Sequence, residues 1–436
     1  MKFYNRESEL ATLDKIALRS KDQAQMTVVV GRRRIGKTSL LRKSSQDKLS
    51  VYLFVAKKTE QLLCKEFLEI IQEALAIPYF GEISQFKDLF AWVMELSKQR
   101  NFMLIIDEFQ EFYSINPAVY SDMQHIWDSN KDQSKINLIL CGSVNSLMVK
   151  IFENVKEPLF GRATSKLIVK PFEVNVVEEI LRDNYPSYSK RDLLDFYALT
   201  GGVAKYVEAF VNAQAFTSDD MLDEVLQPRS LFLDEGRNIL IEEFGKDYHT
   251  YFSILTLIAS SKTSRPEIES VLEMSVGAYL DKLENDYGII RRIKPILSKE
   301  TSRKIKYMIE DNFLSFWFRF IYRYRSAVEI ENYNFIKTAI QRDYQTYLGP
   351  VLEKYFKDKF KASGTYSNIG TYWTKQSQGE IDLVGINELE KTVTFAEIKL
   401  NKNNISIPLL EAKSQTVLDQ LPNYKPTYLA LSLEDM

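Results

Sequence analysis

The chain has 436 residues, of which 45% are hydrophobic, so it is long enough for two to four domains that each bury a core. Its 57 lysines and arginines nearly balance its 59 aspartates and glutamates, which excludes a whole-molecule field that draws it onto nucleic acid or an anionic membrane. Its 2 cysteines are too few for a disulfide framework or a thiolate zinc site. Its 2 histidines nearly exclude histidine-based catalysis.

The chain begins with a charged segment, MKFYNRESEL, which lacks the apolar core of a secretory signal. No apolar stretch reaches the length of a membrane span, and the most apolar one, FLSFWFRFIYRYR, is interrupted by arginines. We therefore expect a cytoplasmic protein with no membrane partner.

Residues 1–170 are predicted to form an α/β domain. A strand is expected at 26–30 (MTVVV), followed by a glycine-rich turn and a helix. Further strands, separated by helices, are expected at 51–56, 102–107 and 136–142. Short, almost entirely apolar strands that alternate with helices are typical of a parallel sheet covered on both faces.

The segment GRRRIGKT has the spacing of a P-loop. Backbone amides can wrap phosphates only where glycines remove side-chain bulk, and the following helix adds its dipole. Lys37 is then expected to reach the β- and γ-phosphates, and the Thr38 hydroxyl to ligate magnesium. No guanine-reading Asn-Lys-x-Asp motif is present, so ATP and ADP are the expected nucleotides. The predicted nucleotide-binding residues of this segment are Gly31, Arg32, Arg33, Arg34, Ile35, Gly36, Lys37, Thr38 and Ser39.

The segment FMLIIDEF is expected to complete the site. Asp107 at the strand end can hold magnesium through water, and Glu108 can orient and deprotonate the attacking water. The next strand ends at Ser143, which we expect on the γ-phosphate side. Arg162 has two interpretations: it approaches a phosphate in cis or from a neighbouring subunit, or it is a surface arginine paired with an acid. The predicted catalytic residues are Lys37, Glu108 and Arg162.

The remaining chain is predicted to contain four segments. Helical patterns with a break at Gly201-Gly202 indicate a lid, and a charged helical connector follows it. Three helices and a strand pair then indicate a winged helix-turn-helix. Its helix is acidic and its wing basic, so contact with DNA and contact with a protein are both open. The predicted boundaries are 171–215 for the lid, 216–249 for the connector, 250–310 for the winged helix and 311–436 for the last domain.

The aromatic segment 313–325 could stack on bases, but its spacing favours a helix packed in the core. Phe313, Phe316, Trp317 and Phe320 are expected to be buried. The arginines of this segment are expected to point outward: Arg319, Arg323 and Arg325.

Near the C-terminus, QGEIDLVGINELEKTVTFAEIKL contains the acids and lysine of a PD-(D/E)xK nuclease site. Such a site needs an acid on a preceding helix, which Glu353 supplies, then an acid at a strand end, which is Asp382. Glu397 and Lys399 follow on the next strand, and residues two apart on a strand share a face. The acids would hold magnesium and the lysine would position water. The alternative is an amphipathic hairpin with alternating polar residues.

These motifs together resemble the archaeal-type ATPases of the AAA+/STAND group. The resemblance to the ATPases rests on six motifs: FYNRESEL, GRRRIGKT, LIIDEFQE, LILCGS, PLFGR and TGGVAKY. Three further segments resemble that group's C-terminal domain of unknown function: YMIEDNFLSFWFRF and the terminal EIDLV and AEIK. The resemblance implies an N-terminal box, Phe3, Arg6 and Glu7, that packs near the adenine, and a restriction-endonuclease-like α/β fold at the C-terminus. The lid motif of that group usually has proline where this chain has Ala204.

Three functional hypotheses follow. The first is a magnesium-dependent ATPase whose nucleotide state repositions a tail that acts on or docks to DNA. The second is a signalling switch in which the tail is a catalytically inactive module that binds a protein partner or another copy of the chain. The third is a nuclease that ATP only regulates.

Overall fold

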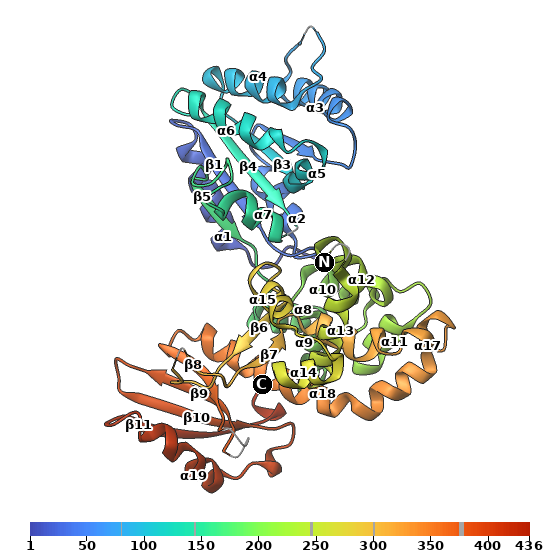
Figure 1. The fold of residues 1–436 in the computed structure, drawn as a ribbon, viewed down its shortest axis with the longest axis vertical. Helices are drawn as coiled ribbons and strands as arrows, with labels where there is room; N and C mark the ends of the chain where they lie inside the picture. The colour runs from blue at the N-terminus through green and yellow to red at the C-terminus, as the bar shows by residue number, and fades with distance from the viewer. Residues whose placement is uncertain (80, 144, 245–246, 300, 375–378) are drawn as a thin grey trace. The chain divides into compact units, whose positions relative to one another are not determined.

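The computed structural model of the chain describes residues 1–79, 81–143, 145–244, 247–299, 301–374 and 379–436. Two compact units make up the chain: Asn5–Lys170, and a second unit formed by Met1–Tyr4 together with Pro171–Met436 (Figure 1). No helix of the described residues is long and apolar enough to cross a membrane.

The unit Asn5–Lys170 is built on a five-stranded parallel sheet with the strand order β2-β3-β4-β1-β5. Every residue of β3 and β4, two of the three inner strands, is buried, which is why their sequences are continuous apolar runs. The sequence does not predict β5, whose residues alternate between half-buried and exposed at the sheet edge. The strands are β1 (Gln25–Val30), β2 (Ser50–Phe54), β3 (Phe102–Asp107), β4 (Ile136–Gly142) and β5 (Ser165–Ile168).

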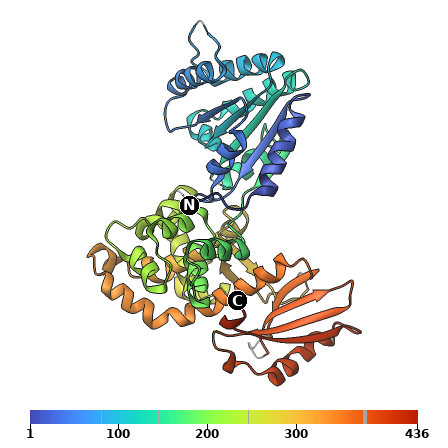
Figure 2. The ribbon, with the colours of Figure 1, turned by 180° about the vertical axis from the view of Figure 1, so that it is seen from behind.

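Helices cover both faces of this sheet, as the strand pattern predicts (Figures 1 and 2). One face packs on α3, α4 and α6 through a single apolar cluster, and α1 contacts β1 and α2. The helices are α1 (Glu7–Arg19), α2 (Lys37–Ser45), α3 (Glu60–Leu75), α4 (Phe86–Gln99), η1 (Phe109–Glu111), α5 (Phe112–Ile115), α6 (Ala118–Asn130) and α7 (Asn145–Glu153).

The second unit begins with a series of short helices. Helix α9 starts at a capping box formed by Ser189 and Asp192, and it ends at Gly201, whose φ of 56° is left-handed. A Cβ on Gly202 would lie 2.3 Å from the carbonyl oxygen of Phe172, so the predicted Gly-Gly break is a close backbone crossing. The helices are α8 (Val174–Asn184), α9 (Lys190–Thr200), α10 (Ala204–Ala213), α11 (Ser218–Leu226) and α12 (Leu231–Phe244).

Three helices and an antiparallel strand pair follow, where the sequence predicts them. Helix α14 begins at a capping box formed by Ser264 and Glu267, with proline in its first turn. The elements are α13 (Tyr248–Ala259), α14 (Arg265–Leu272), α15 (Gly277–Asn285), β6 (Ile290–Ile293) and β7 (Lys306–Ile309).

The aromatic segment joins the preceding helices in one core. Phe313 lies 4.3 Å from Tyr206 between ring centroids, and Trp317 donates a hydrogen bond of 2.9 Å to the carbonyl of Leu233. Phe313, Phe316, Trp317 and Phe320 are all buried, which confirms the core prediction. Side chains of this segment pack on α10 and α12, across the domain boundary predicted at residue 311, which stays a prediction. The segment forms α16 (Asn312–Phe316), the π-helical η3 (Trp317–Tyr322) and α17 (Arg325–Glu329).

The chain ends in a four-stranded mixed sheet with the order β11-β10-β9-β8. β9 is antiparallel to β8 and β10, whereas β11 is parallel to β10. Helix α19 packs on β9, β10 and β11, and the 30-residue α18 contacts β8, β9 and β10. The elements are α18 (Tyr333–Ala362), β8 (Asn368–Tyr372), β9 (Ile381–Asn387), β10 (Thr392–Ile398), η4 (Lys402–Asn404), α19 (Ile407–Leu418), β11 (Lys425–Leu431) and η5 (Leu433–Asp435).

Candidate nucleotide-binding site and a second acidic site

The loop between β1 and α2 requires its two glycines. Gly36, directly before α2, has a φ of 94°, which side chains with a Cβ rarely adopt. A Cβ on Gly31 would lie 2.6 Å from the carbonyl oxygen of Val169. The backbone amides of residues 31–36 therefore lead without side-chain obstruction into the N-terminus of α2, which is the arrangement that binds phosphates.

Lys37 is folded back into this loop. Its Nζ donates hydrogen bonds to the carbonyl oxygens of Gly31 at 2.7 Å and Arg32 at 3.1 Å. The side chain is buried, and burial lowers its pKa. The ammonium group thus lies inside the loop, where an anion would replace carbonyl oxygens as its partner.

Asp107, at the carboxyl end of β3, holds two hydroxyl groups. Thr38 donates to its Oδ2 at 3.2 Å, and the hydroxyl of Tyr52 on the neighbouring strand β2 donates to the same oxygen. Burial, followed by the hydrogen bond to Asp107, raises the pKa of Tyr52. Sequence reasoning missed Tyr52, whose only signal is a polar tip near the end of an apolar strand.

Glu108 has a left-handed backbone, with a φ of 53°. Its Oε2 accepts a 2.7 Å hydrogen bond from the hydroxyl of Ser143 and a second one from the side-chain amide of Gln110. The carboxylate is therefore fixed between the ends of β3 and β4. Ser143 was a predicted site residue, whereas Gln110 was not, because a glutamine after a strand carries no distinctive signal.

The second acidic site lies on the C-terminal sheet. Lys399 is 2.9 Å from Asp382 Oδ2 and 3.3 Å from Glu397 Oε1. Asp382 also accepts the backbone N–H of Ile398 at 2.8 Å. Glu397 lies 3.3 Å from Lys413 as well, and Glu353 lies 3.6 Å from Lys357. The three predicted acids therefore each have a lysine partner.

Two pKa shifts characterise this second site. Burial raises the pKa of Glu353 to about 7, so this carboxyl is partly protonated at neutral pH. For Lys399, burial alone would lower the pKa, but the hydrogen bond to Asp382 and the charges of Asp382 and Glu397 raise it. Over the part of the chain that the structure describes, no group of three or more His, Cys, Asp or Glu side chains is placed to hold a metal ion.

Known families match two parts of the chain. Residues 3–210 match the family of ATPase domains found predominantly in Archaea. These residues are therefore similar to an ATPase domain of that family, over slightly less than half of the chain. Residues 317–415 match a family of archaeal and bacterial proteins of unknown function, which covers the second acidic site.

The chain also has relatives in sequence and in structure. The chain is 29% identical over 406 residues to an uncharacterized protein of Methanocaldococcus jannaschii, which covers 91% of this chain and 87% of that protein. A Walker-type ATPase of Pyrococcus abyssi superimposes with a TM-score of 0.56 at 19% identity, over 72% of this chain and 96% of that one. That superposition shows a shared fold. The ORC2 protein of Aeropyrum pernix gives a TM-score of 0.49 at 13% identity, over 78% of this chain and 96% of that one.

Magnesium fits the donor set of the ATPase domain. Thr38 is exposed, and its hydroxyl lies within 3.2 Å of the Asp107 carboxylate. Both are hard oxygen donors of the kind that Mg²⁺ prefers. Thr38 and Asp107 are therefore the residues of this domain that would hold the ion beside the loop.

Arg162 lies at the end of the sheet of the ATPase domain opposite to the loop. It precedes β5, where Thr164 N–H donates to the carbonyl of Met26 near the start of β1, whereas the loop follows the end of that strand. Its guanidinium pairs with Asp128 at 2.9 Å. Parallel strands separate these ends by about 13 Å, which favours the surface arginine paired with an acid, and a phosphate contact in cis stays a prediction. Contact from a neighbouring subunit stays a prediction.

Arg6 of the ATPase domain is buried and anchors the N-terminal segment. Its guanidinium pairs with Glu9 at 2.9 Å and donates a 2.6 Å hydrogen bond to the carbonyl of Lys170. The role near the adenine that the resemblance implies for Arg6 stays a prediction.

The arginines of the strand pair β6–β7 are already paired. Arg291 lies 2.8 Å from Glu310, and Arg292 lies 3.0 Å from Asp281 on the acidic helix α15. The strand pair also contacts the C-terminal sheet, where Ile296 N–H donates to Thr371 at 2.8 Å. These pairings reduce the positive charge that this region offers to phosphates.

Proposed function

We propose that this chain is a magnesium-dependent ATPase. The observation that carries the proposal is the convergence of Lys37, the Thr38–Asp107 pair and Glu108 at the carboxyl ends of β1 and β3. The carboxyl edge of the parallel sheet thereby supplies a phosphate-binding lysine, the metal ligands and a candidate general base. Residues 3–210 match a family of ATPase domains, which supports the same activity.

In this proposal each residue has a separate role. The loop amides and Lys37 bind the β- and γ-phosphates, and Thr38 with Asp107 holds the ion. Bound magnesium would neutralise charge on the phosphates. Glu108 orients the attacking water and accepts its proton, while Ser143 and Gln110 position its carboxylate. Because Ser143 and Gln110 both occupy Oε2, one of these bonds must lengthen or Oε1 must be the reacting oxygen.

Removal of divalent metal is expected to abolish ATP turnover. Thr38 and Asp107 supply oxygen ligands that hold the ion, and bound magnesium would neutralise charge on the phosphates that the cations of the loop leave uncompensated. Phosphate release should fall to background in EDTA and return when magnesium is added in excess. Turnover that persists in EDTA contradicts the proposed metal role.

We further propose that the C-terminal module, which carries a nuclease-like motif, binds DNA without cleaving it. The nucleotide state of the ATPase site is coupled to this module. Glu397 and Glu353 pair with Lys413 and Lys357, which are not part of the nuclease motif. These pairs favour binding over cleavage, because metal ligands must be ionised and free of competing cations. The second candidate is an inactive module that binds a protein partner or another copy of the chain. The pairing of Arg291 and Arg292 with acids favours that alternative.

DNA cleavage is therefore expected to be absent. The wild-type protein and the variant Asp382→Asn are incubated with DNA in magnesium or manganese, with and without ATP. The matched control is Asp419→Asn, because Asp419 is exposed at the end of α19. All three proteins should show the same background. Metal-dependent cleavage that Asp382→Asn removes and Asp419→Asn retains makes the module a nuclease. DNA binding, measured in the same samples by anisotropy, separates the DNA-binding module from the protein-interaction module.

A further inference from the structure

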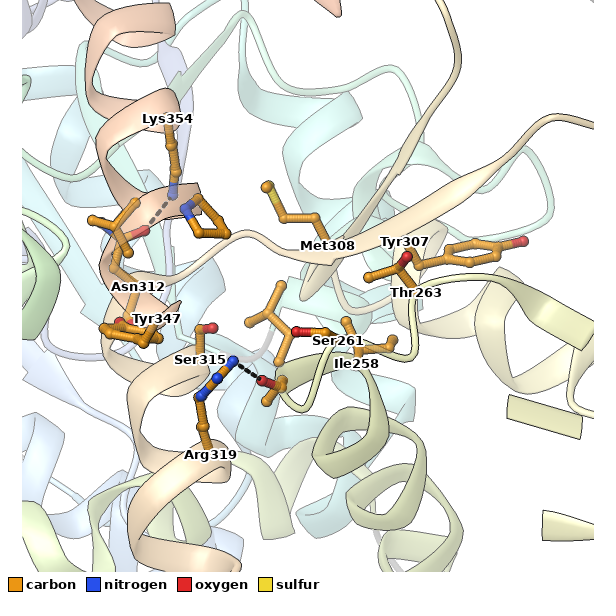
Figure 3. A pocket seen from close by; sticks show the side chains of 14 residues that line it. Ile258, Ser261, Thr263, Tyr307, Met308, Asn312, Ser315, Arg319, Tyr347 and Lys354 are labelled. Atoms are coloured by element: carbon orange, nitrogen blue, oxygen red, sulfur yellow. Dashed lines mark hydrogen bonds between the residues drawn. The ribbon is translucent and has the colours of Figure 1, made fainter. Parts of the chain in front are cut away.

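A pocket of about 120 Å³ in the second unit holds two cationic side chains (Figure 3). It lies between the end of α13, strand β7, the segment α16–η3 and the middle of α18. Arg319 and Lys354 line it together with apolar residues, among them Ile258, Met308 and Val351. The nucleotide site and the second acidic site share no residue with it.

Neither cation has a carboxylate partner among the described residues. Arg319 donates from Nη1 to the carbonyl of Ala259 at 3.2 Å. Lys354 donates to Asn312 Oδ1 at 2.9 Å and to the carbonyl of Glu310. Burial lowers the pKa of both groups. Carboxylates act on both groups at longer range, Asp343 on Arg319 and Glu310, Asp358 and Asp311 on Lys354. A half-buried cation whose hydrogen-bond partners are all dipolar is still costly, and an anion in the pocket would offset part of that cost.

The helices that carry these cations are both irregular at the pocket. Arg319 belongs to the π-helical segment η3, and such segments occur frequently at functional sites. Pro350 lies inside α18 and lines the pocket, where it lacks the N–H that a regular helix requires. The spacing of the segment predicts that Arg319 points to solvent. The π-helical turn changes the phase of the helix, so Arg319 faces the pocket instead. Two departures from regular helix at one pocket favour a function over simple packing.

Hydrogen-bond donors remain available around the pocket. The hydroxyls of Ser261, Thr263 and Ser315 line it, and none of them bonds to another described residue. Figure 3 shows Ser315 beside the guanidinium of Arg319. The pocket thus combines cations, free hydroxyls and an apolar wall.

This combination selects a class of ligand. A guanidinium is shaped to bind a carboxylate through two parallel hydrogen bonds. Inorganic phosphate would place polar oxygens against Ile258, Met308 and Val351, where they find no donor. The volume corresponds to about four water molecules at ~30 Å³ each, which suits a short hydrocarbon chain.

We propose that this pocket binds a short aliphatic carboxylate. Its carboxylate pairs with Arg319 and Ser315, its hydrocarbon body lies against Ile258, Met308 and Val351, and Lys354 binds its other end when that end is polar. A monocarboxylate and a dicarboxylate share this chemistry, and they differ in their need for Lys354.

Calorimetric titration tests the proposal. The full-length Lys37→Ala variant is titrated with butyrate, succinate, inorganic phosphate and the neutral amide butyramide, so that the nucleotide site does not dominate the signal. Butyrate or succinate should bind and butyramide should not. Adding Arg319→Gln should weaken binding roughly 10- to 100-fold, because a charge-assisted pair is lost. Arg323→Gln, an exposed arginine of the same segment, is the control and should leave affinity unchanged.

A second variant keeps the test decisive if Arg319→Gln unfolds. Val351→Phe fills the pocket and keeps both cations, so it should remove binding while circular dichroism shows a folded protein. Loss of succinate binding but not butyrate binding in Lys354→Met assigns the ligand to the dicarboxylates. The proposal is overturned if neither acid binds, if only phosphate binds, or if Val351→Phe and Arg319→Gln bind as tightly as Arg323→Gln.

Discussion

Replacing Lys37 by alanine is expected to lower ATP turnover by at least about 100-fold, the scale on which removal of one preorganised electrostatic donor acts. The ammonium group already lies inside the loop, bonded to the carbonyls of Gly31 and Arg32. Because it is buried, no surface lysine can take its place. Nucleotide affinity should fall together with turnover, since Lys37 contacts the phosphates before and during reaction.

The measurement is phosphate release at saturating ATP, with affinity from a fluorescent nucleotide. Lys43→Ala is the matched control, because this exposed lysine lies on the same helix α2 and bonds only to Gln46. Wild-type turnover in Lys37→Ala would contradict the proposed ATPase site. Equal losses in both variants would point to helix destabilisation instead.

Replacing Glu108 by glutamine is expected to separate binding from hydrolysis. Glutamine keeps the shape and can still bond to Ser143, but it cannot accept a proton from water. Loss of a general base typically lowers the rate by about 10²- to 10⁴-fold. ATP affinity should stay close to that of the wild type, because Lys37, Thr38 and Asp107 are unchanged.

Single-turnover kinetics with labelled ATP check this prediction, since they report the chemical step without product release. Glu73→Gln, an exposed acid on α3, is the control and should behave as the wild type. A Glu108→Gln protein that hydrolyses ATP at the wild-type rate excludes Glu108 as the base. One that fails to bind ATP indicates that Glu108 supports the loop and not the water.

The α/β fold of the first unit could be predicted because its signals are local. Continuous apolar runs mark buried parallel strands, and a strand followed by Gly-x-x-x-x-Gly-Lys-Thr has few other conformations. The same local encoding located the cap of α14 and the break at Gly201-Gly202. The edge strand β5 lacked such a signal, because only half of its residues face the core.

The arrangement of side chains was decided by contacts between distant segments. Tyr52 reaches Asp107, and Ser143 reaches Glu108, only because β2, β3 and β4 are neighbours in the sheet, and strand order is absent from any local pattern. Arg162 lies at the opposite end of the strands for the same reason.

In the second unit the same limit applies to charges and to helix phase. The spacing of Glu397 and Lys399 predicted that they share one face. The ion pair of Lys399 with Asp382 depends on the pairing of β9 with β10, and that of Glu397 with Lys413 depends on how α19 packs on the sheet. A regular helical period predicts that Arg319 points outward. In the structure Arg319 belongs to a π-helical segment and lines a pocket together with Lys354. The sequence shows which residues of the segment are apolar. Packing against other helices decides where a turn takes up the extra residue of a π-helix.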